Sequence, residues 1–140
     1  MSAFRKFSAV AVGASALVMV FASQAAAGSG EGCGGDGHCL RFSFNSDQGG
    51  SQTYLWGSNI PDLASYKFLT LGGGEGYSLK NHAASAANFS PYPATVYFNS
   101  NYAGSCDTLS DYAYADKLHN TYNNNASVRF NYSGSGCYKF

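Results

Sequence analysis

The stretch "YFNSNYAGSCDTL", Tyr97 to Leu109, indicates how this chain of 140 residues folds. Two aromatic residues, Tyr97 and Tyr102, stand five positions apart, and Gly104 follows two positions after the second. The earlier stretch "SFNSDQGGSQTYL", Ser43 to Leu55, has Phe, Asn, Ser, Gly, Ser and Leu in the same six places. A phrase that recurs in this way predicts the internal duplication of one supersecondary unit.

The rest of the chain has the composition of a β protein. Gly, Asn, Ser, Tyr and Phe are abundant, and helix-forming residues at a 3.6-residue spacing are scarce. Short runs with the period-two character of strands are separated by Gly, Asn, Asp, Ser or Pro: "CLRFSFN", "SQTYLW", "SYKFLTL", "ATVYFN" and "SVRFNY". The loops "NSDQGG" and "NSNYAG" lie between such runs, so we expect hairpin turns in which Gly50 and Gly104 take a positive φ.

A second pair of similar segments extends the repeat. "KNHAAS", Lys80 to Ser85, and "NNNASV", Asn123 to Val128, each follow their phrase and lead into an apolar segment. Because neither unit can bury its apolar face alone, we expect the two to pack sheet on sheet as an all-β sandwich.

Residues 1–27 have the three parts of a secretory signal peptide: a charged head, an apolar run and an A-x-A cleavage site, in that order. We therefore expect a secreted, extracellular protein. In it, residues 28–39 form a flexible, Gly-rich N-terminus and residues 40–140 a single domain.

The exported part carries six basic and eight acidic residues and has no block of like charges. Nucleic acids and anionic membranes are therefore not expected as partners. About one hundred residues suffice for a single hydrophobic core, and we expect a monomer.

Four cysteines, Cys33, Cys39, Cys106 and Cys137, all lie in the exported part. An oxidising compartment lets disulfides persist, so two bridges are expected. Four cysteines allow three pairings, and the simplest local set joins Cys33 to Cys39 and Cys106 to Cys137.

The spacing of Tyr97, Tyr102 and Gly104, with the Asn-rich stretch that follows it, resembles the βγ-crystallin Greek key. Two such keys make one domain, so the resemblance implies a disulfide-stabilised, βγ-crystallin-like sandwich with keys at about 40–90 and 95–140. The segments "CGGDGHC", "IPDLASYKF" and "LKNHAASAAN" are similar to secreted bacterial peptidase inhibitors of this fold, whose founding activity is against metalloproteinases.

This similarity implies an inhibitor of an extracellular metallopeptidase, a thermolysin-like zinc protease, as protein partner. Two segments are candidates for the inhibitory contact. One is the loop of Ile60, Pro61, Asp62 and Leu63, for which a structural turn between strands is the alternative interpretation. The other is the C-terminal Phe140, because a terminal carboxylate can ligate a catalytic zinc.

Family members that bind calcium use the six-residue stretch after each phrase. The first stretch has Lys80 and Ala84 where oxygen-bearing side chains are expected, and the second keeps Asn123, Asn124 and Ser127. Calcium prefers six to eight oxygens, usually with carboxylates among them. Neither stretch contains Asp or Glu, so we expect no required cofactor and only a weak calcium site in the second key.

Two other functions stay open. A non-inhibitory domain of this fold could serve as a structural or weakly calcium-binding secreted module, and small secreted killer toxins also use the fold. The motifs H-E-x-x-H and G-x-S-x-G are absent, so no enzyme is expected. The run "GGGEG" at residues 72–76 lacks the strand and helix that a phosphate-binding loop requires.

Overall fold

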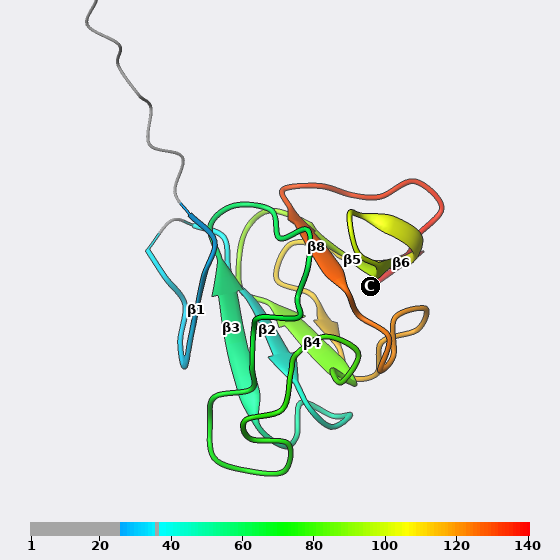
Figure 1. Cartoon of the computed structure of the whole chain (residues 1–140). Coiled ribbons are helices and arrows are strands. Elements are labelled where there is room, and N and C mark those ends of the chain that lie inside the picture. Colours follow the sequence, from blue (N-terminus) through cyan, green and yellow to red (C-terminus); the bar gives the residue numbers. More distant parts are fainter. Residues whose placement is uncertain (1–25, 36) are drawn as a thin grey trace, which may run out of the picture.

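The computed structural model describes residues 26–35 and 37–140, and this part of the chain folds into two β-sheets without a helix (Figure 1). No helix there could cross a membrane. The signal peptide predicted for residues 1–27 lies almost wholly outside the described residues. The strands are β1 (Gly28–Gly30), β2 (Leu40–Ser43), β3 (Gln52–Trp56), β4 (Ser85–Asn88), β5 (Ala94–Asn99), β6 (Ala103–Leu109), β7 (Tyr114–Ala115), β8 (Ser127–Phe130) and β9 (Tyr138–Lys139).

The first sheet has the order β1-β3-β2-β4-β7 and the second the order β8-β5-β6-β9. Each half of the chain supplies a segment to the sheet of the other half. From the second key, β7 pairs with β4 and places Ala115 opposite Ala86. From the first key, Ile60 pairs with Val128, with both main-chain hydrogen bonds at 2.9 Å. The two keys therefore share one hydrophobic core.

The backbone confirms the duplication that the two phrases predict. Three positions of each hairpin turn have a left-handed conformation, which is uncommon for residues other than glycine. The φ values are 56°, 59° and 73° at Asp47, Gln48 and Gly50, and 58°, 62° and 81° at the equivalent Asn101, Tyr102 and Gly104. Gly50 and Gly104 thus have the positive φ expected of them.

A serine at the start of β4 and of β8 holds each turn in place. The hydroxyl of Ser85 accepts a hydrogen bond from the main-chain nitrogen of Gln48 at 3.1 Å and donates one to the oxygen of Asn45 at 2.6 Å. Ser127 makes the equivalent pair of bonds to the second turn. Both serines are completely buried.

These serines correct the alignment of "KNHAAS" with "NNNASV". The sequence comparison sets Lys80 opposite Asn123, whereas the structure makes Ser85 equivalent to Ser127. Asn81 is then equivalent to Asn123, and the two have φ values of 66° and 52°. The register shifts by one residue because the serine that locks the turn, and not the run of asparagines, is the shared element.

The N-terminal segment, expected to be a flexible terminus over residues 28–39, is part of the fold. Strand β1 pairs with β3 along its whole length. A Cβ added at Gly28 or Gly34 would lie 2.4 or 2.3 Å from the ring of Trp56. The glycines are therefore required by close packing against this indole, and the sheet begins before residue 40.

Two aromatic rings form a corner over the second turn. The rings of Tyr97 and Tyr102 lie 6.1 Å apart at 69°, an edge-to-face arrangement. The first key has the polar residues Ser43 and Gln48 at these two positions, so hydrogen bonds of the Gln48 side chain replace the aromatic contact. The side-chain amide of Gln48 donates to the oxygens of Ala86 and Ala115, both at 3.2 Å.

Both disulfides of the simplest pairing are present. Cys33–Cys39 closes the segment between β1 and β2, and Cys106–Cys137 ties β6 to the chain just before β9. Two disulfides in an all-β domain are compatible with an extracellular location. The core between the sheets is built from Leu40, Phe42, Leu55, Ile60, Leu63, Phe68, Leu79, Val96, Leu109, Leu118, Val128 and Phe130, with several alanines.

Candidate functional site

The predicted inhibitory loop, residues 60–63, is anchored in the core by its apolar members. Ile60 and Leu63 are 2% and 0% exposed. The main-chain nitrogen of Leu63 also donates to the oxygen of Ala126 at 2.9 Å. In this conformation neither side chain can contact a partner, and the geometry fits the alternative interpretation of a structural turn.

The other two members of this loop, Pro61 and Asp62, are exposed. The oxygen of Pro61 accepts a hydrogen bond from the nitrogen of Asn101 at 2.8 Å. Asp62 accepts from the nitrogen of Ala64 at 2.9 Å and forms an ion pair with Lys80 at 3.0 Å. These two contacts, the main-chain bond first, hold the pKa of Asp62 below its usual value. The loop thus links the two keys.

The C-terminal Phe140 is held against the second sheet and packs partly on the core. Its nitrogen donates to the oxygen of Thr108 at 2.9 Å. Its own main-chain oxygen accepts from the nitrogen and the hydroxyl of Ser110, at 3.2 and 2.7 Å. The main-chain oxygen of Phe140 is therefore already engaged within the protein.

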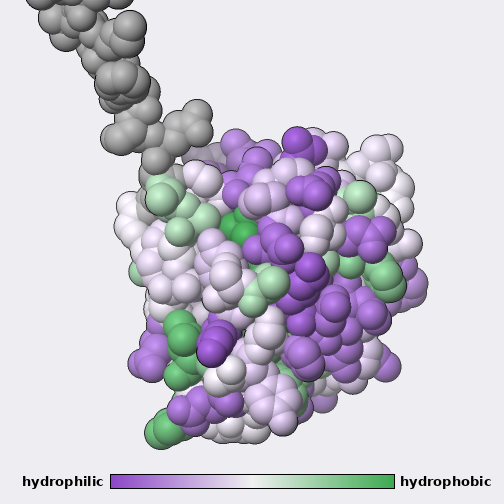
Figure 2. All heavy atoms as spheres, in the orientation of Figure 1, coloured by the Kyte–Doolittle hydropathy of each residue, from purple (hydrophilic) through white to green (hydrophobic). Residues whose placement is uncertain are grey.

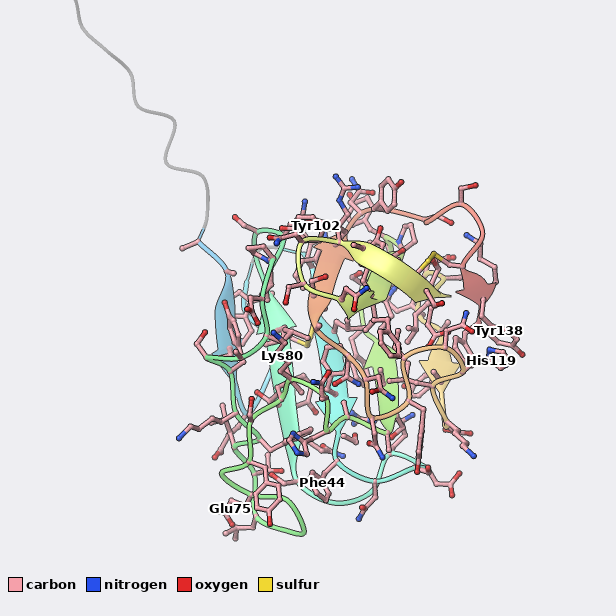
Figure 3. All side chains as sticks on the ribbon, turned by 45° about the vertical axis from the view of Figure 1, so that its right-hand side comes forward. Phe44, Glu75, Lys80, Tyr102, His119 and Tyr138 are labelled. Atoms are coloured by element: carbon pink, nitrogen blue, oxygen red, sulfur yellow. A yellow bond between two sulfur atoms is a disulfide. The ribbon has the colours of Figure 1, made fainter. Side chains whose placement is uncertain are left out.

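A different loop carries the most exposed large apolar side chain in the described residues. We call residues 67–78 the projecting loop; it forms the lower green extension of the fold in Figure 1. Leu71 is 87% exposed, and Leu69 and Tyr77 are 38% and 56% exposed. Glu75 of this loop lies at the opposite end of the molecule from Tyr102 (Figure 3). Figure 2 shows hydrophobic residues at the lower edge of the molecule as separate patches among hydrophilic ones.

The main chain of the projecting loop is clamped to the beginning of β3. The nitrogens of Leu69 and Thr70 both donate to the oxygen of Gln52, at 3.0 and 3.1 Å, and the nitrogen of Gln52 donates to the Thr70 hydroxyl at 2.8 Å. The nitrogen of Ser51 donates to the oxygen of Gly73 at 2.8 Å, and the Ser51 hydroxyl donates to the oxygen of Thr70. These bonds fix the chain on both sides of the exposed leucine.

The underside of the loop packs on an aromatic cluster. The ring of Phe44 meets the rings of Phe68 and Tyr77 edge to face, with centroids 5.5 and 5.4 Å apart. Gly74 lies so close that an added Cβ would be 2.1 Å from the Phe44 ring. The glycines of this loop therefore permit close packing on a fixed base.

The sequence predicts a strand at the start of this loop, because "SYKFLTL" has the period-two pattern of a strand. That prediction is wrong: the described residues between β3 and β4 contain no strand, and this segment makes only the isolated bridge between Lys67 and Ser78. The groups that clamp it, Ser51 and Gln52, belong to the first repeated phrase. The sequence could not show this clamp, because Ser51 and Gln52 are distant from the loop along the chain.

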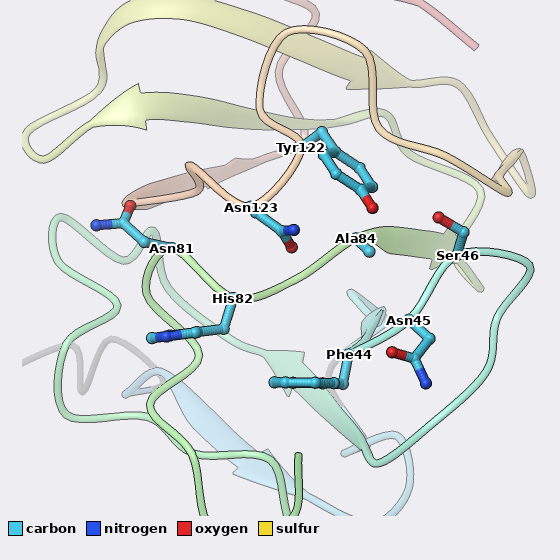
Figure 4. Close-up of a pocket in the computed structure, with 8 residues that line it drawn as sticks. All are labelled: Phe44, Asn45, Ser46, Asn81, His82, Ala84, Tyr122 and Asn123. Atoms are coloured by element: carbon cyan, nitrogen blue, oxygen red, sulfur yellow. The ribbon is translucent and has the colours of Figure 1, made fainter. Parts of the chain in front are cut away.

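A cavity of about 220 Å³ lies where segments of the two keys meet (Figure 4). Of the residues predicted to bind calcium, only Asn123 lines it. The lining residues are Phe44, Asn45, Ser46, Asn81, His82, Ala84, Tyr122 and Asn123, and none of these is acidic. The cavity thus offers amide and hydroxyl groups and aromatic rings, without the carboxylates that calcium prefers.

The other two predicted calcium ligands are engaged or apart from the cavity. The hydroxyl of Ser127 is buried and bonded to the second turn, and the amide of Asn124 donates to the oxygen of Tyr122 at 3.0 Å. In the part of the chain that the structure describes, no group of three or more His, Cys, Asp and Glu residues could hold a metal ion. The three predicted residues therefore do not fit a calcium ion as a set.

Two solved structures are similar to parts of this chain. One, described as "Evolution of the eye lens beta-gamma-crystallin domain fold", matches with a TM-score of 0.58 over 75% of this chain and 96% of its own, at 12% identity. The chain has the βγ-crystallin fold. At this identity the match shows the fold alone, which is the fold that the repeated phrase predicts.

The second structure, the N-terminal domain of protein S, has a TM-score of 0.48 and 26% identity, over 66% of this chain and 93% of its own. No protein-family model and no curated protein matches the chain. The comparisons thus show the fold that the resemblance implies, and they give no evidence of peptidase inhibition.

Proposed function

We propose that this βγ-crystallin-like protein is a secreted inhibitor of an extracellular zinc metallopeptidase of the thermolysin-like kind. The similarity of "CGGDGHC" and "IPDLASYKF" to secreted peptidase inhibitors suggests the activity. The observation that carries the proposal is the projecting loop, which presents an exposed leucine on a clamped main chain.

An inhibitor must enter the cleft of its target without losing much conformational entropy. Glycine loses more freedom on ordering than any other residue, so a free loop with Gly72, Gly73, Gly74 and Gly76 would bind weakly. Here the bonds to Ser51 and Gln52 order the loop before any partner arrives. Because β3 lies inside its sheet, between β1 and β2, the clamp is itself firmly held.

The shape of the loop fits a protein cleft better than a small ligand. The loop projects from the fold and exposes Leu69, Leu71 and Tyr77, with Lys67 and Glu75 as its only charged residues. Such exposed apolar side chains gain free energy when they enter a pocket that excludes water. An extracellular peptidase offers such a pocket beside its catalytic zinc.

The test is a titration of the purified chain, beginning at Gly28, against a thermolysin-like zinc peptidase and a serine peptidase. We expect stoichiometric loss of the zinc enzyme's activity and no effect on the serine enzyme. Unchanged activity of the zinc enzyme at excess inhibitor would refute the proposal. If the melting temperature also rose with Ca²⁺, a structural calcium-binding module would replace it.

A further inference from the structure

We infer that Leu71 is the side chain that enters the peptidase's apolar pocket, and that Ser51 protects the adjacent Thr70–Leu71 bond from cleavage. This inference deepens the proposed function and rests on it. It assigns the contact residue and explains how a loop presented to a protease stays intact.

The side chain of Leu71 is not buried against any part of its own protein. It is 87% exposed, and the chain before it is held at both the nitrogen and the oxygen of Thr70. The chain after it is held at the oxygen of Gly73. The main chain therefore holds the leucine on the surface. The free energy gained by burying its side chain is available only when a partner binds.

The residues that follow Leu71 let a partner approach closely. Gly72 and Gly73 are exposed and have no side chains to obstruct a neighbouring main chain. On the inner side, a Cβ at Gly72 would lie 3.2 Å from the nitrogen of Ser51. At this point the loop presents one large side chain, Leu71, followed by two residues without side chains. A peptidase could therefore bind the leucine in an apolar pocket while its own surface lies close to the main chain of the loop.

The bond at risk is Thr70–Leu71 if the peptidase accepts the leucine in the pocket for the residue that follows the cleaved bond. In that hydrolysis, the oxygen of water bonds to the carbonyl carbon of Thr70. The C–N bond to Leu71 breaks, and a proton passes to the leucine nitrogen, which becomes a new amino terminus. The catalytic zinc assists by polarising the Thr70 carbonyl oxygen.

That carbonyl oxygen is turned away from a partner. It accepts the hydrogen bond of the Ser51 hydroxyl, while the Thr70 nitrogen and hydroxyl are both bonded to Gln52. Ser51 is itself completely buried, and its nitrogen donates to Gly73. Ser51 is therefore a positioning residue: it holds the oxygen that the zinc would need against the scaffold, so the leucine can bind while the bond resists attack.

The test compares the wild-type chain with three variants, each first checked for an unchanged thermal transition. L71A removes the anchor without touching the fold, because the side chain is exposed. S51A frees the Thr70 carbonyl. T70V is the matched control: it removes the Thr70 hydroxyl bond to Gln52 but leaves the Ser51 bond to the carbonyl in place.

Each protein is titrated against the zinc peptidase and then incubated with it, with cleavage followed by mass spectrometry. We expect L71A to weaken inhibition by about tenfold or more. We expect wild type and T70V to stay intact, and S51A to be cut between Thr70 and Leu71 so that its inhibition decays with time.

The outcomes separate the two proposals. If wild type does not inhibit, the proposed function fails and this inference fails with it. If wild type inhibits and L71A inhibits equally well, the function stands and the anchor is wrong. If S51A stays intact, or wild type is cut at Thr70–Leu71, the protective role of Ser51 is wrong; the wild-type arm decides this even where S51A does not fold.

Discussion

Ser127 holds the second hairpin turn by the same two hydrogen bonds with which Ser85 holds the first. Its hydroxyl accepts from the nitrogen of Tyr102 at 3.0 Å and donates to the oxygen of Asn99 at 2.7 Å. Tyr102, like Gln48 in the first turn, has a positive φ that is unfavourable for a side chain of its kind. The serine is thus the contact that stabilises a strained turn in each key.

Replacing either serine by alanine should therefore destabilise the whole domain. S85A and S127A each leave a partly buried main-chain nitrogen, that of Gln48 or Tyr102, without its partner, which costs about 1 to 3 kcal/mol. Urea unfolding measures the loss, and S105A, at an exposed position of β6, serves as the control and should change stability by less than about 0.5 kcal/mol. A loss no larger than that of the control would contradict the role assigned to the two serines.

The contacts of the Asp62 carboxylate, with the Ala64 nitrogen first and Lys80 second, predict a pH-dependent contribution to stability. The pKa of Asp62 is lower in the folded chain than its usual 3.8, so the ionised carboxylate favours folding. This contribution is fully present above the usual pKa and is lost as the pH falls through the lowered value.

D62N should therefore be less stable than wild type near neutral pH, and the difference should vanish in strong acid. Urea midpoints of both proteins across this range measure it. D111N changes the net charge equally at an exposed position and is the control. Because Asp62 is half exposed, the effect is expected to be small. A difference that persists unchanged in strong acid would contradict this assignment.

The duplicated features of the fold were predictable because each is local. Gly50 and Gly104 show a turn that needs a positive φ, and the spacing of Tyr97 and Tyr102 shows the aromatic corner. All of these lie inside one short phrase, so the sequence pattern contains their physical cause.

Features that depend on distant partners were not predictable. The glycines at Gly28 and Gly34 have the composition of a flexible tail, and only Trp56 shows why they are needed. Likewise, Ile60 and Leu63 have the pattern of an exposed loop around a proline, yet the second key buries them. The projecting loop could not be predicted for the same reason, because the residues that clamp it belong to the first hairpin.

The disulfides should contribute unequally. On the chain-entropy model, the bridge between Cys106 and Cys137, which spans 31 positions, stabilises by about 4 kcal/mol, and the six-position bridge between Cys33 and Cys39 by about 2. Thermal unfolding of the two double-alanine variants measures this. Equal losses, or the larger loss for the N-terminal pair, would show that contacts of the native state outweigh loop closure.

Calcium should not stabilise the chain. The cavity between the keys has no acidic lining residue, and the Ser127 hydroxyl is engaged in the second turn. Melting temperatures in excess EDTA and in millimolar Ca²⁺ should therefore agree. A control variant, N123D, adds the missing carboxylate to the cavity, so a rise with Ca²⁺ seen in N123D alone would confirm the reason. A rise in wild type would contradict it.

The glycines of the projecting loop give a prediction that links stability to binding. Gly74 and Gly76 have similar φ values of 86° and 78°, so alanine costs a comparable backbone strain at both. They differ in space: a Cβ at Gly74 would meet the Phe44 ring at 2.1 Å, whereas nothing lies within 4 Å of one at Gly76. G74A should therefore displace the loop from its aromatic base.

We expect G74A to weaken inhibition of the zinc peptidase far more than G76A does, and to lower the melting temperature further. Because the core of the fold does not depend on this glycine, G74A should still unfold cooperatively, and hydrogen exchange should increase at the nitrogens of Leu69 and Thr70. If G74A and G76A inhibit equally, the Phe44 base does not position the loop. If both inhibit like wild type, the peptidase is bound elsewhere on the molecule.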